Sequence, residues 1–200
     1  MTDQTNGRRV VAAMNFSIDG HYAKPEANDM GWVLPYAVTD VARDHMTSLW
    51  TPSTTALLGR LNAEGFMGYW PTIIGTDGVD SRDEAFAKWL VATEKVVLSS
   101  TLTDAPWERT SIVNKPTADA VDELKATDGG DIVVFNSASV IKALLAADKV
   151  DRLALMIFPI FLGAGPRLFE DGLPESQWKL ATQSSGEEGA LALVYDRVRD

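Results

Sequence analysis

Short apolar runs separated by amphipathic segments constrain this chain more than any other feature. The runs lie at residues 10–14, 55–59, 95–99, 131–135 and 153–158. Each is too short for a buried helix and ends in, or is followed by, Asn, Gly, Ser or Pro, which is typical of a fully buried strand. The segments between them carry helix signals, so the alternation predicts a mostly parallel sheet with helices on its faces.

The helix signals are specific at several points. Thr39 is predicted to start a helix. The apolar residues that follow it at helical spacing are Ala42, Met46, Leu49 and Trp50. Ser81 and Glu84 have the spacing of a capping box, which predicts a helix that starts at Ser81. A further helix from Thr117 is predicted to stop at the Gly pair of residues 129–130.

The last third of the chain carries a different pattern. Residues 178–183 and 191–195 alternate apolar and polar side chains, and residues 184–189 between them are polar or Gly. This pattern predicts a terminal antiparallel hairpin. The predicted fold is therefore a three-layer α/β/α sandwich with a mixed, mostly parallel sheet and a C-terminal antiparallel hairpin. We expect one domain over residues 1–200 with a flexible tail at 1–7, and an exposed edge strand that favours a homodimer.

Charge and hydropathy exclude several classes of partner. The chain has 18 Lys and Arg against 28 Asp and Glu, a net charge of −10. That charge and the lack of a basic stripe disfavour nucleic acid as a partner. No apolar run approaches the roughly 20 residues of a spanning helix, so we expect no membrane partner. The polar N-terminus predicts no secretory signal, and we expect a cytoplasmic protein that acts on a small molecule.

Metal and thiol chemistry are also disfavoured. The sequence contains no Cys, which excludes disulfides, thiolate nucleophiles and Cys-ligated metal. Its two imidazoles, His21 and His45, lie in different segments without a ligand spacing. We therefore expect no metal site, and two histidines at the surface or half-buried.

Polar residues follow the predicted strands at three points where the sheet should present free N–H groups. The strongest is residues 136–139, Asn-Ser-Ala-Ser, between a strand and a helix. Free donors there suit a pyrophosphate. Alternatively, Ser137 or Ser139 only caps the helix, and the spacing alone favours this capping role.

The other two strand ends are Gly59-Arg60 and residues 99–101, Ser-Ser-Thr. Arg60 has the forked donor geometry that binds phosphate, or it forms a surface pair with Glu64 four residues later. Hydroxyl clusters such as residues 99–101 usually mark turns.

Three further residues are candidates for a substrate site. Asp19 precedes Gly20, and such an Asp either stabilises a turn, its commoner role, or faces substrate as an acid. Trp32 and Tyr36 lie in a Gly- and Pro-rich loop that could present their rings to a planar ligand.

In order along the chain, these segments resemble the dihydrofolate reductase-like superfamily. More narrowly, they are similar to the reductase domain of the bifunctional riboflavin-biosynthesis deaminase/reductase. The matching stretches are residues 17–20, residues 57–60 with Glu64 and Trp70-Pro71, residues 95–99 with Thr101-Leu102 and Trp107, Leu124-Lys125, residues 131–134, and residues 158–169. They span nearly the whole chain.

The resemblance implies an NADPH-dependent reductase that transfers a hydride to a small polar heterocycle such as a pterin or pyrimidine. It implies that Gly59, Arg60, Ser99, Ser100 and Thr101 flank the adenosine 2′-phosphate. It places the pyrophosphate at Asn136, Ser137, Ala138 and Ser139. The loop with Asp19 would cover nicotinamide and substrate, with Asp19 or solvent as the proton source.

The chain departs from the family pattern at two points on the cofactor side. Asn136 replaces the first Gly of the pyrophosphate turn, and Asn62-Ala63 replaces Thr and an aromatic residue. Two alternatives therefore stay open: a non-catalytic module that binds a small planar ligand, and an enzyme that uses a flavin.

Overall fold

The computed structural model describes residues 7–27, 29–186 and 188–199. Within these residues eight strands form one sheet in the order β4-β3-β2-β5-β1-β6-β8-β7. The strands are β1 (Val10–Ser17), β2 (Ser53–Gly59), β3 (Glu94–Leu98), β4 (Thr110–Val113), β5 (Asp131–Phe135), β6 (Arg152–Phe158), β7 (Gln177–Ser185) and β8 (Leu191–Val198). The pairs from β4 to β6 are parallel, whereas β8 is antiparallel to both β6 and β7. The predicted mixed sheet and terminal hairpin are confirmed.

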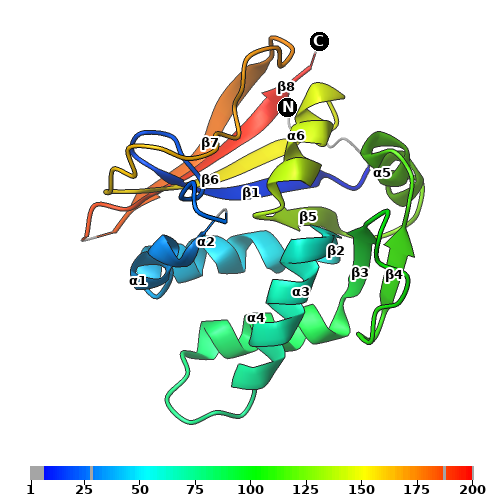
Figure 1. Cartoon of the computed structure of the whole chain (residues 1–200), viewed down its shortest axis with the longest axis horizontal. Coiled ribbons are helices and arrows are strands. Elements are labelled where there is room, and N and C mark those ends of the chain that lie inside the picture. The colour runs from blue at the N-terminus through cyan, green and yellow to red at the C-terminus, as the bar shows by residue number, and fades with distance from the viewer. Residues whose placement is uncertain (1–6, 28, 187, 200) are drawn as a thin grey trace.

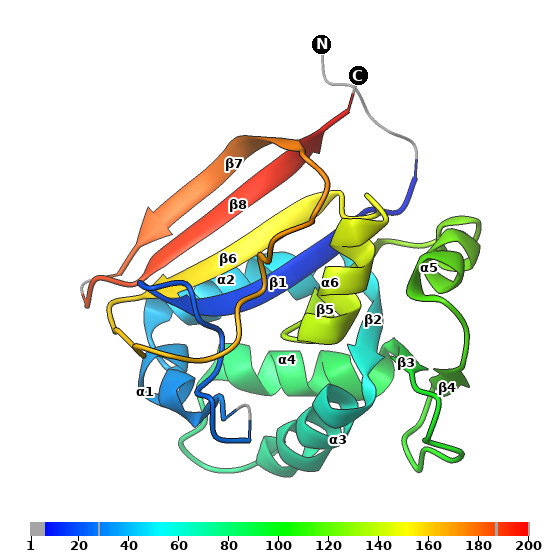
Figure 2. The same ribbon diagram turned by 45° about the horizontal axis from the view of Figure 1, so that its top comes forward.

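Helices cover both faces of the sheet (Figure 1). One face carries α2 (Asp40–Trp50), α3 (Arg60–Tyr69) and α4 (Ser81–Ala92), and the other carries α5 (Thr117–Lys125) and α6 (Ala138–Ala146). The remaining elements are α1 (Leu34–Ala37) and the 3-10 turns η1 (Gly31–Val33) and η2 (Trp70–Ile73). Figure 2 shows the β7–β8 hairpin extending past the helices at one end of the sheet. The three-layer α/β/α architecture is confirmed.

The central strand β5 shows how the sequence produces these layers. All five of its residues are buried. Ile132 and Val134 belong to the apolar cluster under α5 and α6, whereas Val133 and Phe135 belong to the cluster under α2 and α4. Successive side chains of a strand point to opposite faces, so an uninterrupted apolar run requires cover on both sides.

Two local expectations about helices are corrected. Helix α4 is capped by Asp80, whose carboxylate accepts the N–H of Arg82 at 2.9 Å, and Ser81 is its first helical residue. A carboxylate next to the free N–H groups of a helix is an effective cap, so the capping box is wrong. In α2 the buried residues are Val41, His45 and Leu49; the other three residues of the predicted face are half-buried.

Several expectations remain predictions. Among the residues described, no helix combines the length and apolar character needed to cross a bilayer. Of the tail expected at residues 1–7, residues 1–6 lie outside the described residues. Strand β7 forms one edge of the sheet and is exposed along most of its length. Such an edge fits the expected homodimer, which stays a prediction.

Candidate functional site

The parallel order of β3, β2, β5 and β1 brings the carboxyl ends of these strands to one edge of the sheet. A cleft with a volume of about 800 Å³ opens at this edge, and we call it the outer cleft. All nine residues that the sequence predicts for the cofactor line it, namely Gly59, Arg60, Ser99, Ser100, Thr101, Asn136, Ser137, Ala138 and Ser139. The three strand ends singled out in the sequence therefore form one surface.

Helix α6 starts in the outer cleft and presents its first turn there. No hydrogen bond in the described part of the chain engages the N–H groups of Ala138, Ser139 and Val140. These donors and the helix dipole favour an anion at this point. Ser137 precedes the helix without capping it, because its hydroxyl accepts the N–H of Gly59 at 3.1 Å. The capping role is therefore wrong for Ser137, which joins β2 to α6.

Asn136 adopts the left-handed conformation that the family pattern assigns to Gly, with φ of +48°. Asn tolerates this region better than most residues. Its N–H donates to Ala13 O at 2.9 Å, and its Oδ1 accepts the N–H of Asn15 at 3.3 Å. The side chain is thus turned toward β1 and tied there.

At the other two strand ends, the side chains of Arg60 and Ser99 form local contacts within the same segment. The Arg60 guanidinium lies 3.1 Å and 3.2 Å from the two carboxylate oxygens of Glu64, which confirms the predicted pair, and both side chains are exposed. Ser99 Oγ accepts the N–H groups of Thr101 and Leu102 at 3.1 Å and 2.9 Å. Ser99 therefore shapes the turn after β3.

A second, smaller hollow lies between β1 and α2, and we call it the inner cavity. Its volume is about 80 Å³. Most of its lining is apolar and comes from β1, β5, β6, α2 and the loop before it. Its polar lining residues are Asn15, Arg43, His45, Asp83 and Asn136. Because Asn136 lines both hollows, they meet at the end of β5.

His45 lies on the buried face of α2 and lines the inner cavity, so the expectation of a surface or half-buried position is wrong. Its side chain follows Val41 by four residues and precedes Leu49 by four, which turns it toward the sheet. Burial lowers the pKa of His45 to about 4, so the ring is neutral at pH 7. His45 Nε2 is buried and has no hydrogen-bond partner among the described residues.

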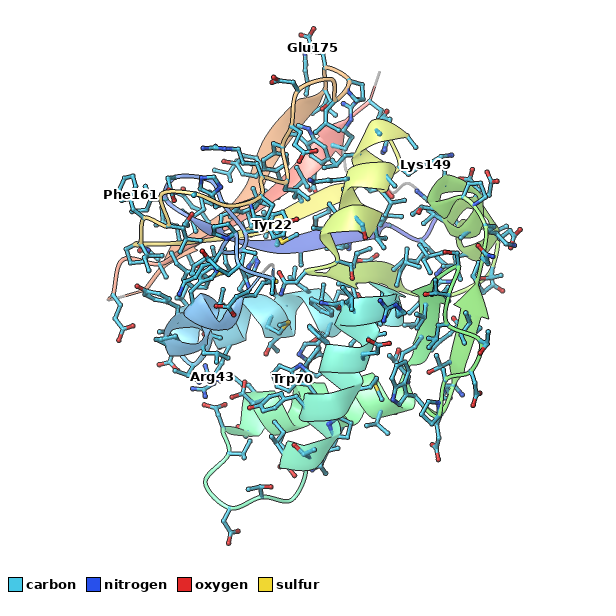
Figure 3. All side chains as sticks on the ribbon, in the orientation of Figure 1. Tyr22, Arg43, Trp70, Lys149, Phe161 and Glu175 are labelled. Atoms are coloured by element: carbon cyan, nitrogen blue, oxygen red, sulfur yellow. The ribbon has the colours of Figure 1, made fainter. Side chains whose placement is uncertain are left out.

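Arg43 is the cation of the inner cavity, and its guanidinium is already paired. It lies 2.8 Å from an Asp83 oxygen and 3.4 Å from an Asp80 oxygen. It also donates to Val38 O at 2.5 Å. Figure 3 shows Arg43 and Trp70, which both line this cavity, on the side of the molecule that carries α2 to α4.

Asp19 joins two loops and lies outside both hollows, as far as the described residues define them. Its carboxylate accepts the N–H of Leu162 at 3.2 Å and of Gly163 at 2.7 Å, and the Ser17 hydroxyl at 2.5 Å. Partial desolvation raises the pKa of Asp19, but these hydrogen bonds outweigh it and lower the pKa to about 2. An ionised carboxylate has no proton to give at neutral pH, so the geometry disfavours Asp19 as the acid.

The second histidine, His21, lies beside the Asp19 carboxylate. His21 is buried, contrary to the expected surface or half-buried position, and its backbone pairs with Arg167 of the loop that follows β6. His21 Nε2 is 3.4 Å from an Arg167 nitrogen and 3.9 Å from an Asp19 oxygen. Among the described residues there is no group of three or more His, Asp or Glu side chains that could hold a metal ion.

The two rings expected to face a ligand pack into the protein instead. Trp32 is buried and meets Phe158 edge-on, with ring centroids 6.0 Å apart. Tyr36 stacks on the same Phe158 at 5.0 Å. Both belong to the apolar cluster under η1 and the end of β6. The loop closes over its own aromatic residues, which removes these rings from the lining of both hollows as described.

The sequence interpretation missed the inner cavity. Its apolar lining comes from strands and helices that are distant in the chain, so no local motif marks it. One signal was present. Val41, His45 and Leu49 recur every four residues, which places His45 on a buried helix face.

Comparisons with known proteins agree with this fold. The model of the RibD C-terminal domain family matches residues 8–191. The uncharacterized protein YyaP of Bacillus subtilis is 24% identical over 195 residues, 98% of each chain. Among solved structures, a pyrimidine reductase-like protein from Corynebacterium diphtheriae is 18% identical with a TM-score of 0.68, covering 96% of this chain and 93% of that one.

A dihydrofolate reductase from Enterococcus faecalis, complexed with NADP(H), is 17% identical with a TM-score of 0.58, covering 96% of this chain and 97% of that one. At these identities the structural likenesses show the fold. The family match spans nearly the whole chain, so this protein belongs to the RibD C-terminal domain family.

Proposed function

We propose that this protein is an NADPH-dependent reductase that acts on a pterin- or pyrimidine-like heterocycle, similar to 5-amino-6-(5-phosphoribosylamino)uracil reductase. The observation that carries the proposal is the convergence of all nine predicted cofactor residues on the outer cleft. The cleft volume of about 800 Å³ lies within the range of sites for small molecules and cofactors.

The donors of the outer cleft fit the phosphates of such a cofactor. The free N–H groups at the start of α6 would hold the pyrophosphate. Gly59 presents no side chain to this turn, and a Cβ at this position would make ordinary contacts with Val140 and Ser139, at 3.5 Å and 3.8 Å. Arg60 would turn from Glu64 to the 2′-phosphate, which offers a charge-assisted, forked contact.

When bound, NADPH supplies the hydride. The chain positions the cofactor and the acceptor ring and excludes water from the acceptor. Asn136 marks the point where the outer cleft meets the inner cavity, so we assign the acceptor ring to the cavity. The apolar walls of the cavity keep water from the acceptor, and the neutral His45 adds no charge to them. Because Asp19 is ionised and lies elsewhere, we assign the proton to solvent.

Titration of the protein with NADPH, followed by cofactor fluorescence, tests the proposal. We expect saturable binding, and oxidation of NADPH at 340 nm when a suitable heterocycle is added. No binding at millimolar NADPH would contradict the proposal and favour the non-catalytic module. A yellow purified protein would favour the flavin alternative.

A further inference from the structure

The inner cavity has room for one small ring. A cavity needs roughly 10–15 Å³ to hold one water molecule. By that measure the volume of about 80 Å³ holds roughly five to eight water molecules, or a single six-membered heterocycle. A ribose and a phosphate on that heterocycle would have to extend past the rim of the cavity.

That rim does not offer a free positive charge. The residues outside the described ranges include no Lys or Arg, and Arg43 is the cation among the described residues that line the cavity. Its guanidinium is shared between Asp83 and Asp80. A phosphate would lie near both carboxylates, and repulsion from them would offset its attraction to Arg43. The rim is therefore poorly suited to a phosphorylated substrate.

The interior offers one polar group that needs a partner. His45 is 9% exposed, and its Nε2 has no hydrogen bond from the described residues. A buried polar atom without a partner is costly, and a ligand that supplies the partner recovers that cost. Met46, Leu49 and Met156 also line the cavity, and their apolar side chains favour contact with an uncharged, flat ligand.

We propose that the inner cavity selects an unphosphorylated, uncharged heterocycle, with the His45 imidazole as the group that recognises its polar edge. This inference rests on the proposed function only in assigning the acceptor to this cavity; binding to the cavity is measured without cofactor. It departs from the 5-phosphoribosyl substrate of the enzyme named in the proposal. His45 is a specificity residue in this account.

Uracil and uridine 5′-monophosphate are the probes. Uracil presents both N–H donors and C=O acceptors, so it can pair with either neutral tautomer of His45. Each is titrated into the protein at pH 7 by isothermal calorimetry, with NADPH binding measured separately by fluorescence. We expect the dissociation constant of uridine 5′-monophosphate to exceed that of uracil by roughly tenfold or more. Equal or tighter binding of the phosphorylated probe would overturn the inference.

Variants at two positions separate the contributions. His45→Leu should weaken uracil binding by roughly tenfold to a hundredfold, whereas His45→Gln, which keeps a polar edge, should recover part of the loss. Asp83→Asn frees Arg43 from one carboxylate and should tighten uridine 5′-monophosphate several-fold more than it changes uracil binding. Unchanged uracil binding in His45→Leu, with normal circular dichroism, would remove His45 from the site.

The NADPH titration keeps this inference distinct from the proposed function. If NADPH binds but uracil does not, the substrate class is wrong and the reductase proposal stands. If uracil binds as expected and NADPH does not, the cavity assignment stands and the reductase proposal fails.

Discussion

The outer cleft and the inner cavity meet at Asn136, yet they are built from different groups. The cleft presents backbone N–H groups and hydroxyls at the ends of parallel strands. The cavity presents side chains from β1, β5, β6 and α2, with one neutral imidazole and one cation that is already paired. Backbone donors depend on the fold, whereas side chains depend on individual residues. We therefore expect the family to share the cleft and to vary the cavity.

The largest expected effect concerns the cavity and its pH dependence. The ordinary pKa of His is 6.5 and burial lowers that of His45 to about 4. Below pH 6.5 the unfolded chain takes up a proton at His45 that the folded chain does not. The free energy of unfolding should therefore fall as pH drops from 6.5 to 4, by about 3 kcal/mol in total.

Urea unfolding at several pH values, compared between the natural chain and His45→Gln, measures this contribution. The variant should lose the part of the pH dependence between pH 6.5 and 4. Asp19 serves as an internal contrast, because hydrogen bonds lower its pKa to about 2 and its contribution is lost only below its ordinary pKa of 3.8. Parallel curves for both proteins would show that His45 titrates normally.

The next effect concerns the cleft. Ala138→Asp places a carboxylate in the first turn of α6, where it stabilises the helix but repels a phosphate. We expect NADPH affinity to fall by about a hundredfold without loss of stability. Ala143→Asp makes the same change at an exposed position on the same helix and should leave NADPH binding unchanged. Equal affinities of the two variants would mean that the cofactor does not contact the start of α6.

Arg60 tests which cofactor the cleft prefers. Arg60→Ala should weaken NADPH by roughly tenfold and leave NADH unchanged, because only NADPH carries the 2′-phosphate. Glu64→Gln removes the carboxylate that competes for Arg60 and should tighten NADPH by a few-fold. Fluorescence titrations with both cofactors measure the ratio. An equal loss for NADPH and NADH in Arg60→Ala would contradict the assigned role.

The smallest effect concerns the contact that joins β2 to α6. Ser137→Ala removes the acceptor of the Gly59 N–H, which should lower the free energy of unfolding by about 1 kcal/mol. Ser139 is exposed, so Ser139→Ala should change stability little. Thermal or urea unfolding of the pair checks the difference. Similar stabilities would show that water replaces the Ser137 hydroxyl.

The sequence predicted the fold and the cleft for the same reason. Buried strands such as β5 are marked by local apolar runs, and the residues after parallel strands must meet at one edge of the sheet. Asn136 and Gly59 could therefore be placed in one cleft before the structure was known. Their side-chain partners could not, because the contact from Gly59 to Ser137 spans 78 positions.

The inner cavity could not be predicted from the sequence, and the reason is again physical. His45 was expected at the surface or half-buried, because it shows no metal-ligand spacing, and its spacing with Val41 and Leu49 was not used. Trp32 was expected to face a ligand because its loop is rich in Gly and Pro. In the structure its ring packs against Phe158 at the end of β6. Packing of this kind depends on tertiary neighbours and leaves no local pattern in the chain.

The central claim is that the strand ends at Gly59, Ser99 and Asn136 hold a phosphorylated nicotinamide cofactor. A crystal structure of the chain soaked with NADPH tests it most directly. We predict density for the pyrophosphate at the N–H groups of Ala138 and Ser139, for the 2′-phosphate beside Arg60, and for the nicotinamide beside Asn136. Density for the dinucleotide elsewhere on the surface, with the outer cleft left to solvent, would contradict the account.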